Sequence, residues 1–476
     1  MNPVADVTLD AEALRELAGA FRGELVRPGD PAYDEHRRVW NGSIDRFPAL
    51  IVRCTGPSDV VAAVRFARGS GLPVAVRGGG HSFPGLSVCD GGIVIDLAPM
   101  KAIVVDAEGR TARVQAGVLW GELDAATQQH GLATTGGIVT HTGVAGLTLG
   151  GGLGVLGRTY GLTSDQLVEA EVVLADGRVV VCDEHREPDL FWALRGAGGG
   201  QFGIVTRFAF RTVPARELTC FTLAWPWSRA VEAIEAWQAW APDAPDAVAA
   251  SLLANVVADF REPVVSVFGT MVAGEGATRA ALDELVERIG SEPVETTLVQ
   301  LPHLAAKRYL AEHAPGVDGE APSPPVMYAK SEFFRRRLPR DAIEALVEHL
   351  VRDRAPGQAR ELDFTPWEGA YNRTPTGATA FAHRSERFLL KHAVVLDAPS
   401  SSRKRVAARD WLAASWSLVH PHGAGGVFPN FPDPDLPEPL RAYHGENLER
   451  LMEVKARSDP DDVFRFPQSI HPAGDS

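Results

Sequence analysis

The sequence predicts a chain of mixed structure, α+β in class, that folds as more than one domain. Its 476 residues exceed what one hydrophobic core usually holds, since domains commonly run to about 100–200 residues. Residues 49–82, ALIVRCTGPSDVVAAVRFARGSGLPVAVRGGGHS, predict a strand, a helix and a second strand. Residues 214–420 have a different pattern, in which longer amphipathic helices alternate with strand-like runs.

The first β-α-β unit leads into a glycine loop. We expect Ser58 to cap its helix and Gly71 to end it, before a strand over Leu72–Val76. Gly78–Gly80 and then His81 follow that strand. Because α/β sheets commonly bind ligands at the carboxyl ends of their strands, the pattern places His81 at a candidate ligand site.

The later elements suggest where the domains divide. Residues 167–182, LVEAEVVLADGRVVVC, predict a hairpin that turns at Asp176 and Gly177, and a short helix begins near Pro188. The glycine-rich character ends near residue 213, so we expect one domain over residues 1–213 and a second over 214–420. Residues 421–476, proline-rich around one helix, predict a return segment that packs on the first domain.

Composition excludes several classes of protein. The net charge of −14 argues against a nucleic-acid partner, because phosphate binding needs clustered Lys and Arg. No run approaches the roughly 20 apolar residues of a membrane span, and the amino-terminal residues lack a secretory signal, so we expect a cytoplasmic enzyme. The four cysteines are far apart and form no CxxC pair, which favours reduced thiols over a metal site.

Three glycine clusters predict a large cofactor that carries phosphate. They are Gly78–Gly80, Gly150–Gly154 and Gly196–Gly200. Glycine lets successive backbone N–H groups approach one anion, although any single cluster also suits a tight turn between strands. Residues 152–157, GLGVLG, match the GxGxxG dinucleotide fingerprint, but Gly161 follows too soon for a crossover helix, so we treat this match as chance.

Four motifs in order resemble a known family. They are RGGGHS (77–82), TGVAGLTLGGGLGVLGRTYGLTSDQ (142–166), PDLFWALRGAGGGQFGIVT (188–206) and a terminal NFPDPDL with SDPDDVFRFPQSI. Together they resemble the berberine bridge enzyme-like branch of the vanillyl-alcohol oxidase flavoproteins. The resemblance implies a two-subdomain FAD-binding domain over residues 1–213 and a substrate domain over 214–420, built as an antiparallel sheet covered by helices.

The resemblance also implies how FAD is held. The matching histidine of the family is bonded through its ring to the 8α-methyl of FAD, and this histidine is His81 here, while neighbouring amides hold the pyrophosphate. The residues expected at FAD are Arg77, Gly78, Gly79, Gly80, His81, Ser82, Val139, Thr142, Gly143, Gly146, Gly150, Gly151, Gly152, Gly154, Gly203, Ile204, Val205 and Asn430.

The chain departs from the family at four positions. Val139 stands where many relatives carry a second flavin-bonding cysteine, so we predict a single covalent bond. Leu153 and Phe428 stand where relatives that oxidise alcohols and sugars carry tyrosines, and neither can take a proton. Thr142 aligns with the position that controls oxygen access in relatives, and by resemblance it favours reaction with O2.

The base that takes the substrate proton is therefore sought elsewhere. His392 aligns with a substrate-facing Glu or Gln of relatives, and its ordinary pKa of about 6.5 suits a base, although it could equally lie on the outer face of its strand. Glu361 and Asp363 share one face of a neighbouring strand, where a solvated edge is the alternative. His141 is an outside candidate, and His383 is expected to pack at the domain junction.

The function expected from these features is that of an FAD-linked oxidase. A small organic substrate, an alcohol or a natural product, gives a hydride to flavin N5, and O2 reoxidises the flavin. Two alternatives stay open: a tailoring oxygenase that uses an oxygenated flavin, and a flavin-binding protein without turnover. A nicotinamide-dependent reductase fits less well with His81. The sequence leaves substrate and oligomeric state open.

Overall fold

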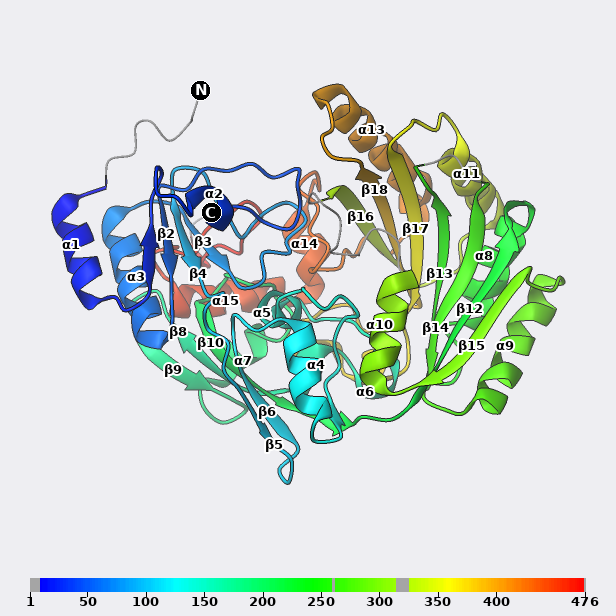
Figure 1. The fold of residues 1–476 in the computed structure, drawn as a ribbon, viewed down its shortest axis with the longest axis horizontal. Helices are drawn as coiled ribbons and strands as arrows, with labels where there is room; N and C mark the ends of the chain where they lie inside the picture. The colour runs from blue at the N-terminus through cyan, green and yellow to red at the C-terminus, as the bar shows by residue number, and fades with distance from the viewer. Residues whose placement is uncertain (1–8, 259–261, 314–324, 475–476) are drawn as a thin grey trace.

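Four β-sheets organise the described residues of the computed structural model, which are 9–258, 262–313 and 325–474 (Figure 1). Part of the amino-terminal segment considered above, residues 1–8, lies outside them. The predicted α+β class is confirmed, because helices and mostly antiparallel sheets occupy separate layers.

The first sheet has the order β1-β2-β4-β3, and its last three strands are parallel. Its strands are β1 (Glu24–Val26), β2 (Leu50–Arg53), β3 (Val74–Arg77) and β4 (Ile93–Asp96), with helices α1 (Ala11–Ala20), α2 (Tyr33–His36) and α3 (Pro57–Ser70). Gly56, and not Ser58, is the N-cap of α3, because Pro57 already takes the first helical position. Gly71 ends α3 as expected, with a left-handed φ of +65°.

The second sheet is antiparallel, with the order β5-β6-β10-β8-β9. Its strands are β5 (Ile103–Asp106), β6 (Thr111–Gln115), β8 (Leu167–Val173), β9 (Val179–Cys182) and β10 (Ile204–Arg211), and β7 (Leu132–Ala133) pairs with β11 (Val213–Pro214). The helices between them are α4 (Trp120–Gln128), α5 (Val144–Leu149), α6 (Gly157–Tyr160) and α7 (Pro188–Ala193). The predicted hairpin turn is present, with Gly177 at φ +83°. Helix α6 spans only four residues, so no crossover helix follows GLGVLG.

The third part is a seven-stranded antiparallel sheet, ordered β15-β12-β14-β13-β17-β18-β16. Its strands are β12 (Leu218–Pro226), β13 (Val248–Val256), β14 (Val264–Met271), β15 (Glu295–Leu301), β16 (Val326–Phe334), β17 (Gln358–Pro366) and β18 (Phe388–Leu396). Helices α8 (Ala230–Trp240), α9 (Glu275–Ile289), α11 (Arg340–Val351) and α13 (Ser402–Val419) cover one face (Figure 1). The predicted antiparallel sheet covered by helices is therefore confirmed. The other face turns toward α10 (His303–His313) and the first part of the chain.

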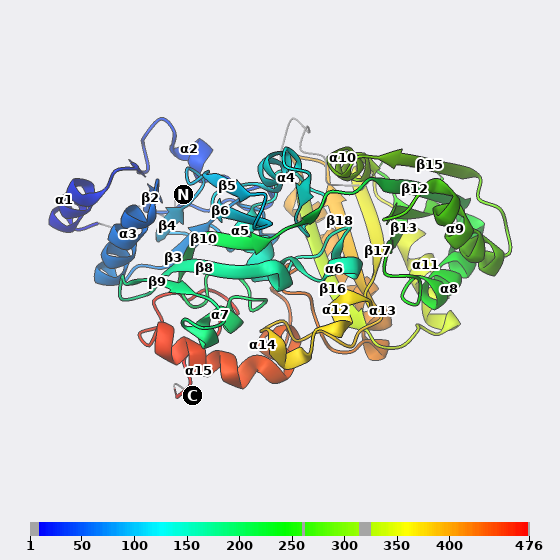
Figure 2. The same ribbon diagram turned by 90° about the horizontal axis from the view of Figure 1, so that it is seen from below.

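The carboxyl-terminal segment returns beneath the first part of the chain. It contains α14 (Pro439–His444) and α15 (Leu448–Ser458), and α15 packs on α7 (Figure 2). Leu451, Val454 and Phe464 belong to the same buried cluster as the first two sheets. The division of the chain at residues 213 and 420 remains a prediction, although the strands change sheet between β10 and β12.

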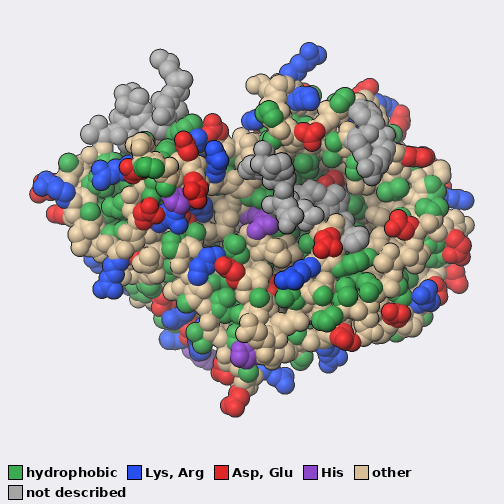
Figure 3. Space-filling model, in the orientation of Figure 1, with side chains coloured by type: hydrophobic (Ala, Val, Ile, Leu, Met, Phe, Trp, Pro, Cys, Tyr) green, Lys and Arg blue, Asp and Glu red, His purple; other side chains and the backbone are tan. Residues whose placement is uncertain are grey.

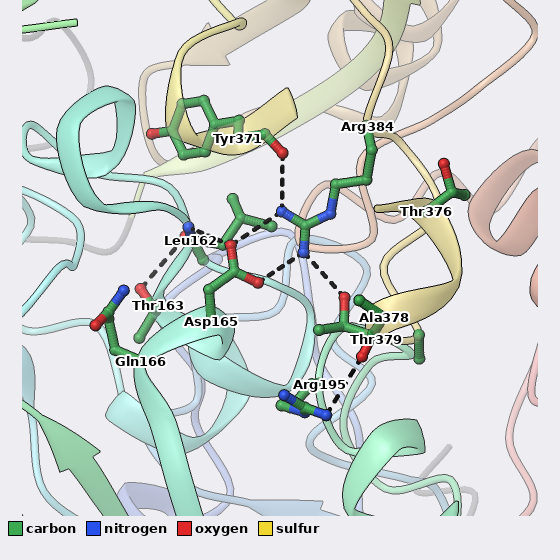
Figure 4. Close-up of polar contacts among 12 residues, drawn as sticks. Leu162, Thr163, Asp165, Gln166, Arg195, Tyr371, Thr376, Ala378, Thr379 and Arg384 are labelled. Carbon is green, nitrogen blue, oxygen red and sulfur yellow. Dashed lines mark hydrogen bonds and ion pairs between the residues drawn. The ribbon is translucent and has the colours of Figure 1, made fainter. Parts of the chain in front are cut away.

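A buried ion pair ties the first two sheets to the connection between β17 and β18, which also carries α12 (Ala370–Arg373). The Arg384 guanidinium donates to both carboxylate oxygens of Asp165, at 2.9 and 2.7 Å, and to Thr379 Oγ1 (Figure 4). Asp165 also accepts from the backbone N–H of Leu162, so the pair holds the turn that follows the central glycine cluster. On the outside, acidic and basic side chains are interspersed over the face drawn in Figure 3.

Candidate active site

A cavity of about 460 Å³ lies where the glycine loops meet the seven-stranded sheet. The loop after β3, residues 137–155 and the start of β10 form one side of it. The face of β13, β14, β17 and β18 that turns away from the covering helices and the segment Phe428–Pro432 form the other. Segments that are more than 300 residues apart in sequence therefore line the same cavity.

The first predicted glycine loop touches Gly143, the residue just before α5. A side chain at Gly79 would place its Cβ 2.3 Å from the backbone nitrogen of Gly143, and one at Gly143 would meet Gly79 N at 2.4 Å. Gly80 adopts a left-handed φ of +69°. Within the described parts of the chain, the N–H groups of residues 79–82 donate to no carbonyl or side chain. Such a cradle fits the diphosphate of a dinucleotide, which would accept from these N–H groups.

His81 reaches the cavity from this loop. Its ring stacks on Trp40, with centroids 4.2 Å apart and planes 17° from parallel, and Trp40 is anchored by its own N–H to the Gly80 carbonyl. The His81 Nε2 atom lies 3.1 Å from His141 Nδ1. Burial, together with the neighbouring His141, lowers the pKa of His81 to about 3, so this imidazole is neutral at physiological pH.

Most of the residues expected at FAD line this cavity. They are Gly78, Gly79, Gly80, His81, Ser82, Val139, Thr142, Gly143, Gly146, Gly154, Gly203, Ile204, Val205 and Asn430. Leu153 and Phe428, where the resemblance leads us to expect tyrosines in relatives, line it too.

Arg77 is an exception, because it points away from the cavity. It is 7% exposed, pairs with Asp96 at 2.7 Å and donates to the carbonyls of His36 and Arg38. Arg77 therefore does not contact the cavity as expected, and its role is structural. It fixes residues 36–38, just ahead of Trp40.

Gly150, Gly151 and Gly152 are also absent from the cavity wall. Gly152 N–H donates to Asn430 Oδ1 at 3.1 Å, and Asn430 Nδ2 donates to the Gly146 carbonyl at 3.1 Å. A Cβ at Gly150 would lie 2.5 Å from Asn430 Nδ2, and one at Gly151 would lie 2.8 Å from Phe381. These glycines therefore make room for their neighbours, and Gly150 and Gly152 position Asn430, which does line the cavity.

Two carboxylates and a lysine face the cavity from the sheet. Asp363 on β17 pairs across the strands with Lys391 on β18, and their charged atoms are 3.0 Å apart. Glu361 lies two residues along β17 and is 2% exposed. Strand β17 lies between β13 and β18, so the alternative of a solvated edge is wrong.

The electrostatics single out Glu361. Burial raises the pKa of Glu361 to about 7, with Lys391 lowering it and Asp363 raising it. Burial by itself would lower the pKa of Lys391, but Asp363 and Glu361 raise it overall. Within the described residues, Glu361 Oε1 has no hydrogen-bond partner. A buried carboxyl that titrates near neutrality, with one oxygen unpaired, can take a proton from a bound molecule.

His392 does not face this cavity. It lies opposite Leu362, on the face of β18 that is covered by α13, where its Nδ1 is 2.8 Å from Ser415 Oγ. It is fully buried, and this burial lowers its pKa to about 3. The expectation that His392 faces the substrate is therefore wrong. Side chains alternate along a strand, and the neighbouring Lys391 is the residue of β18 that faces the cavity.

Three residues near the cavity escaped the sequence reasoning. Lys391 could have been found by assigning alternate residues of β18 to opposite faces of the sheet. No sequence motif around Trp40 indicates that it lies at the cavity. Tyr371 lines the cavity and donates from its hydroxyl to the Gly154 carbonyl at 3.2 Å. Burial raises the pKa of Tyr371 to about 12, which keeps this phenol protonated. His383 is buried, with Nε2 3.1 Å from the Tyr443 carbonyl.

The comparisons with known proteins agree with this geometry. Residues 48–183 match the FAD binding domain family, and residues 427–471 match the family described as berberine and berberine like. The FAD-linked oxidoreductase YgaK of Bacillus subtilis (strain 168) is 33% identical over 94% of this chain and 97% of its own length. The chain belongs to the berberine bridge enzyme-like family of FAD-linked oxidoreductases.

Two further relatives show the range of this berberine bridge enzyme-like family. (R)-6-Hydroxynicotine oxidase of Paenarthrobacter nicotinovorans is 30% identical over 96% of this chain and 98% of its own length. The solved structure of Physcomitrella patens BBE-like 1 superposes with a TM-score of 0.85 at 26% identity, covering 96% of this chain and 98% of that one. The chain is thus an FAD-linked oxidoreductase of a family in which some members oxidise small organic substrates.

None of the helices in the described ranges is both long and apolar enough to cross a membrane. Those same ranges hold no group of His, Cys, Asp and Glu that could bind a metal ion. The four cysteines, all of them described, carry free thiols.

Proposed function

We propose that this chain is an FAD-dependent oxidase of small organic molecules, in which His81 carries the flavin through a single covalent bond and Glu361 is the catalytic base. The observation that carries the proposal is that Glu361 lines the same cavity as His81, with Oε1 unpaired among the described residues and a pKa of about 7. When bound, FAD supplies the hydride acceptor and passes the electrons to O2, which leaves as H2O2.

The protein's own groups divide the remaining work. Glu361 accepts the proton of the substrate hydroxyl or amine, while Lys391, which is paired with Asp363, places its positive charge near the ionised carboxylate and lowers its pKa. Leu153 and Phe428 exclude water from the substrate and offer no competing proton acceptor. Alcohols and other natural products with a proton-bearing heteroatom next to the oxidised carbon are the substrates that this arrangement suits.

A single attachment point is supported by the residues around the ring site. Val139 lines the cavity where bicovalent relatives carry cysteine, and an isopropyl group cannot bond to flavin. Thr142 lines it as well, and we propose that its small β-branched side chain leaves a path for O2.

Two measurements test the proposal. Acid precipitation of the purified holoenzyme should leave the yellow colour in the pellet, and a peptide containing His81 but not residue 139 should carry the flavin mass. A colourless pellet would refute the covalent bond.

The base is tested by anaerobic flavin reduction. Candidate alcohols, amines and polyketide phenols that bleach the wild-type flavin should bleach Glu361→Gln about 10²–10⁴ times more slowly. Glu108→Gln, at an exposed position, is the matched control and should behave as wild type. Equal rates in Glu361→Gln and wild type would exclude Glu361, and oxygen isotope in the product without H2O2 release would favour an oxygenase.

A further inference from the structure

Two carboxylate oxygens on the sheet side of the cavity have no hydrogen-bond partner. They are Glu361 Oε1 and Asp363 Oδ1, both buried, and within the described part of the chain neither accepts a hydrogen bond. The two residues are two positions apart on β17 and both line the cavity, so their side chains leave one face of the strand roughly 7 Å apart. An ionised carboxylate can only accept, so a molecule that satisfies both oxygens must bring at least two donors.

The charge at this end of the cavity is negative. Lys391 lies 3.0 Å from Asp363 and is paired with it, so one positive charge faces two carboxylates. Arg158 also lines the cavity, but its guanidinium donates to four backbone carbonyls, and the carboxylates that act on its pKa are not those of β17. A buried negative charge without a cation is costly, so the missing positive charge is expected from the bound molecule.

The rest of the sheet that lines the cavity is uncharged. Leu253 on β13 lies opposite Asp363, and Ser251 lies opposite Phe268 on β14. Leu253, Ser251 and Ala249 alternate along β13, and all three line the cavity together with Phe268. Because neighbouring strands are about 4.8 Å apart, this surface extends roughly 10 Å from β17 to β14. The cavity therefore has a charged end at β17 and β18 and a mainly apolar end at β13 and β14.

We propose that the substrate is an amphipathic amine that binds as a cation: its N–H groups donate to Glu361 Oε1 and Asp363 Oδ1, and its apolar part lies over β13 against Phe268. This inference rests on the proposed function, which leaves alcohols and amines equally open. A primary or secondary ammonium brings two N–H donors and one positive charge. A hydroxyl brings one donor and no charge, and it would leave one of the two buried oxygens unpaired.

The oxidation of such an amine balances with these groups. The bound ammonium gives one N–H proton to Glu361, which leaves a neutral amine with a lone pair. A C–H bond of the neighbouring carbon then breaks, its hydride leaves with both electrons for the bound flavin, and a C=N bond forms in an iminium cation. Water converts the iminium cation to a carbonyl compound and an ammonium ion. In the overall count, O2 leaves as H2O2 with this hydride and the proton from Glu361.

The test measures binding and not turnover. α,α-Dimethylphenethylamine and α,α-dimethylphenethyl alcohol differ only in the ammonium or hydroxyl group. Neither has a hydrogen on the carbon that bears this group, so neither can reduce the flavin. Titration calorimetry of the holoenzyme near pH 7 should show that the amine binds about 10–100 times more tightly than the alcohol. Equal affinities, or no binding of the amine, would overturn the inference.

Variants test the two ends of the cavity separately. Asp363→Asn keeps the shape of the side chain but not its charge, and it should bind the amine about 10–100 times more weakly while binding the alcohol as wild type does. Asp283→Asn, at an exposed position on α9, is the matched control. Ser251→Leu should weaken the binding of α,α-dimethylphenethylamine but not of tert-butylamine, which lacks the phenyl group. Unchanged amine affinity in Asp363→Asn would contradict the inference.

Proton release gives a readout that a merely structural role would not change. A cation beside Glu361 should lower its pKa from about 7, so wild type should release part of a proton when it binds the amine, and Glu361→Gln should release none. Calorimetry in phosphate and in MOPS, whose ionisation enthalpies differ, counts this proton. If wild type releases none, the cation does not lie beside Glu361 and the inference is wrong.

The failure of this inference can be told apart from the failure of the proposed function. Preference for the alcohol, with slow flavin reduction in Glu361→Gln, would exclude the amine and leave Glu361 as the base. Preference for the amine, with flavin reduction at the wild-type rate in Glu361→Gln, would exclude Glu361 as the base and support the amine site.

Discussion

Glu361 should make the protein less stable as the pH rises, and Glu361→Gln should remove this effect. Burial raises its pKa from an ordinary 4.5 to about 7, so the folded state binds the proton more tightly than the unfolded chain does. The resulting stability is fully present below pH 4.5 and is lost as the pH rises through 7. Glutamine at this position is neutral at every pH and of similar shape.

The magnitude follows from the two pKa values. At about 1.4 kcal/mol for each tenfold change in proton affinity, the ionised carboxylate costs about 3 kcal/mol at high pH. Part of this cost is already present at pH 5, so the free energy of unfolding of Glu361→Gln relative to wild type should increase by roughly 2–3 kcal/mol between pH 5 and pH 8.

Urea unfolding of the two holoenzymes, followed by tryptophan fluorescence at several pH values, measures this difference. The exposed Glu108→Gln serves as the control and should show no such trend. A constant difference between Glu361→Gln and wild type from pH 5 to pH 8 would refute the raised pKa, and with it the argument that Glu361 is poised as a base. Glu361→Gln is thus expected to be more stable but less active than wild type, as is common when a buried catalytic charge is removed.

Three other outcomes are expected. Lys391→Met should raise the pKa of Glu361 further, because the charge of Lys391 lowers it. The pH–rate profile of anaerobic flavin reduction should therefore shift to higher pH. An unchanged profile would show that Lys391 does not affect the ionisation of Glu361. Arg384→Ala should lower the free energy of unfolding, measured by urea unfolding, by about 3–5 kcal/mol, because Asp165 stays buried without its cation. The double variant Arg384→Ala with Asp165→Asn should recover part of this loss. His392→Ala should leave the rate of flavin reduction within about twofold of wild type, because its side chain faces the helices; a large loss of rate would return His392 to the mechanism.

The glycine loops that we expect to hold the cofactor could be found in the sequence because their signals are local. A triple glycine after a strand indicates that the backbone there passes too close to another segment for a side chain to fit. In the folded chain that segment contains Gly143, which lies against Gly79. The order of the four motifs likewise predicted the family. Arg77 shows the limit of this reasoning, since membership of a motif says nothing about where a long side chain points.

The substrate side could be predicted only in part. Glu361 and Asp363 were candidates because residues two positions apart lie on the same face of a strand. Their burial, however, depends on the neighbouring strands β13 and β18. The run FLLKHAVVL of β18 is buried on both faces, so period-two alternation could not tell Lys391 from His392. Helix α13, which covers His392, begins several residues after the strand ends.

By itself, the sequence determined the α+β class and the family, and it predicted the glycine loops and the place of His81 in one of them, because each of these signals is carried by a short local motif. Only the tertiary structure decided which face of the sheet meets the cavity, that Gly150 and Gly152 serve Asn430, and that His141 touches His81. The physical reason is distance along the chain. These contacts join residues 60 to about 280 positions apart, and only the packing of whole sheets brings them within hydrogen-bonding range.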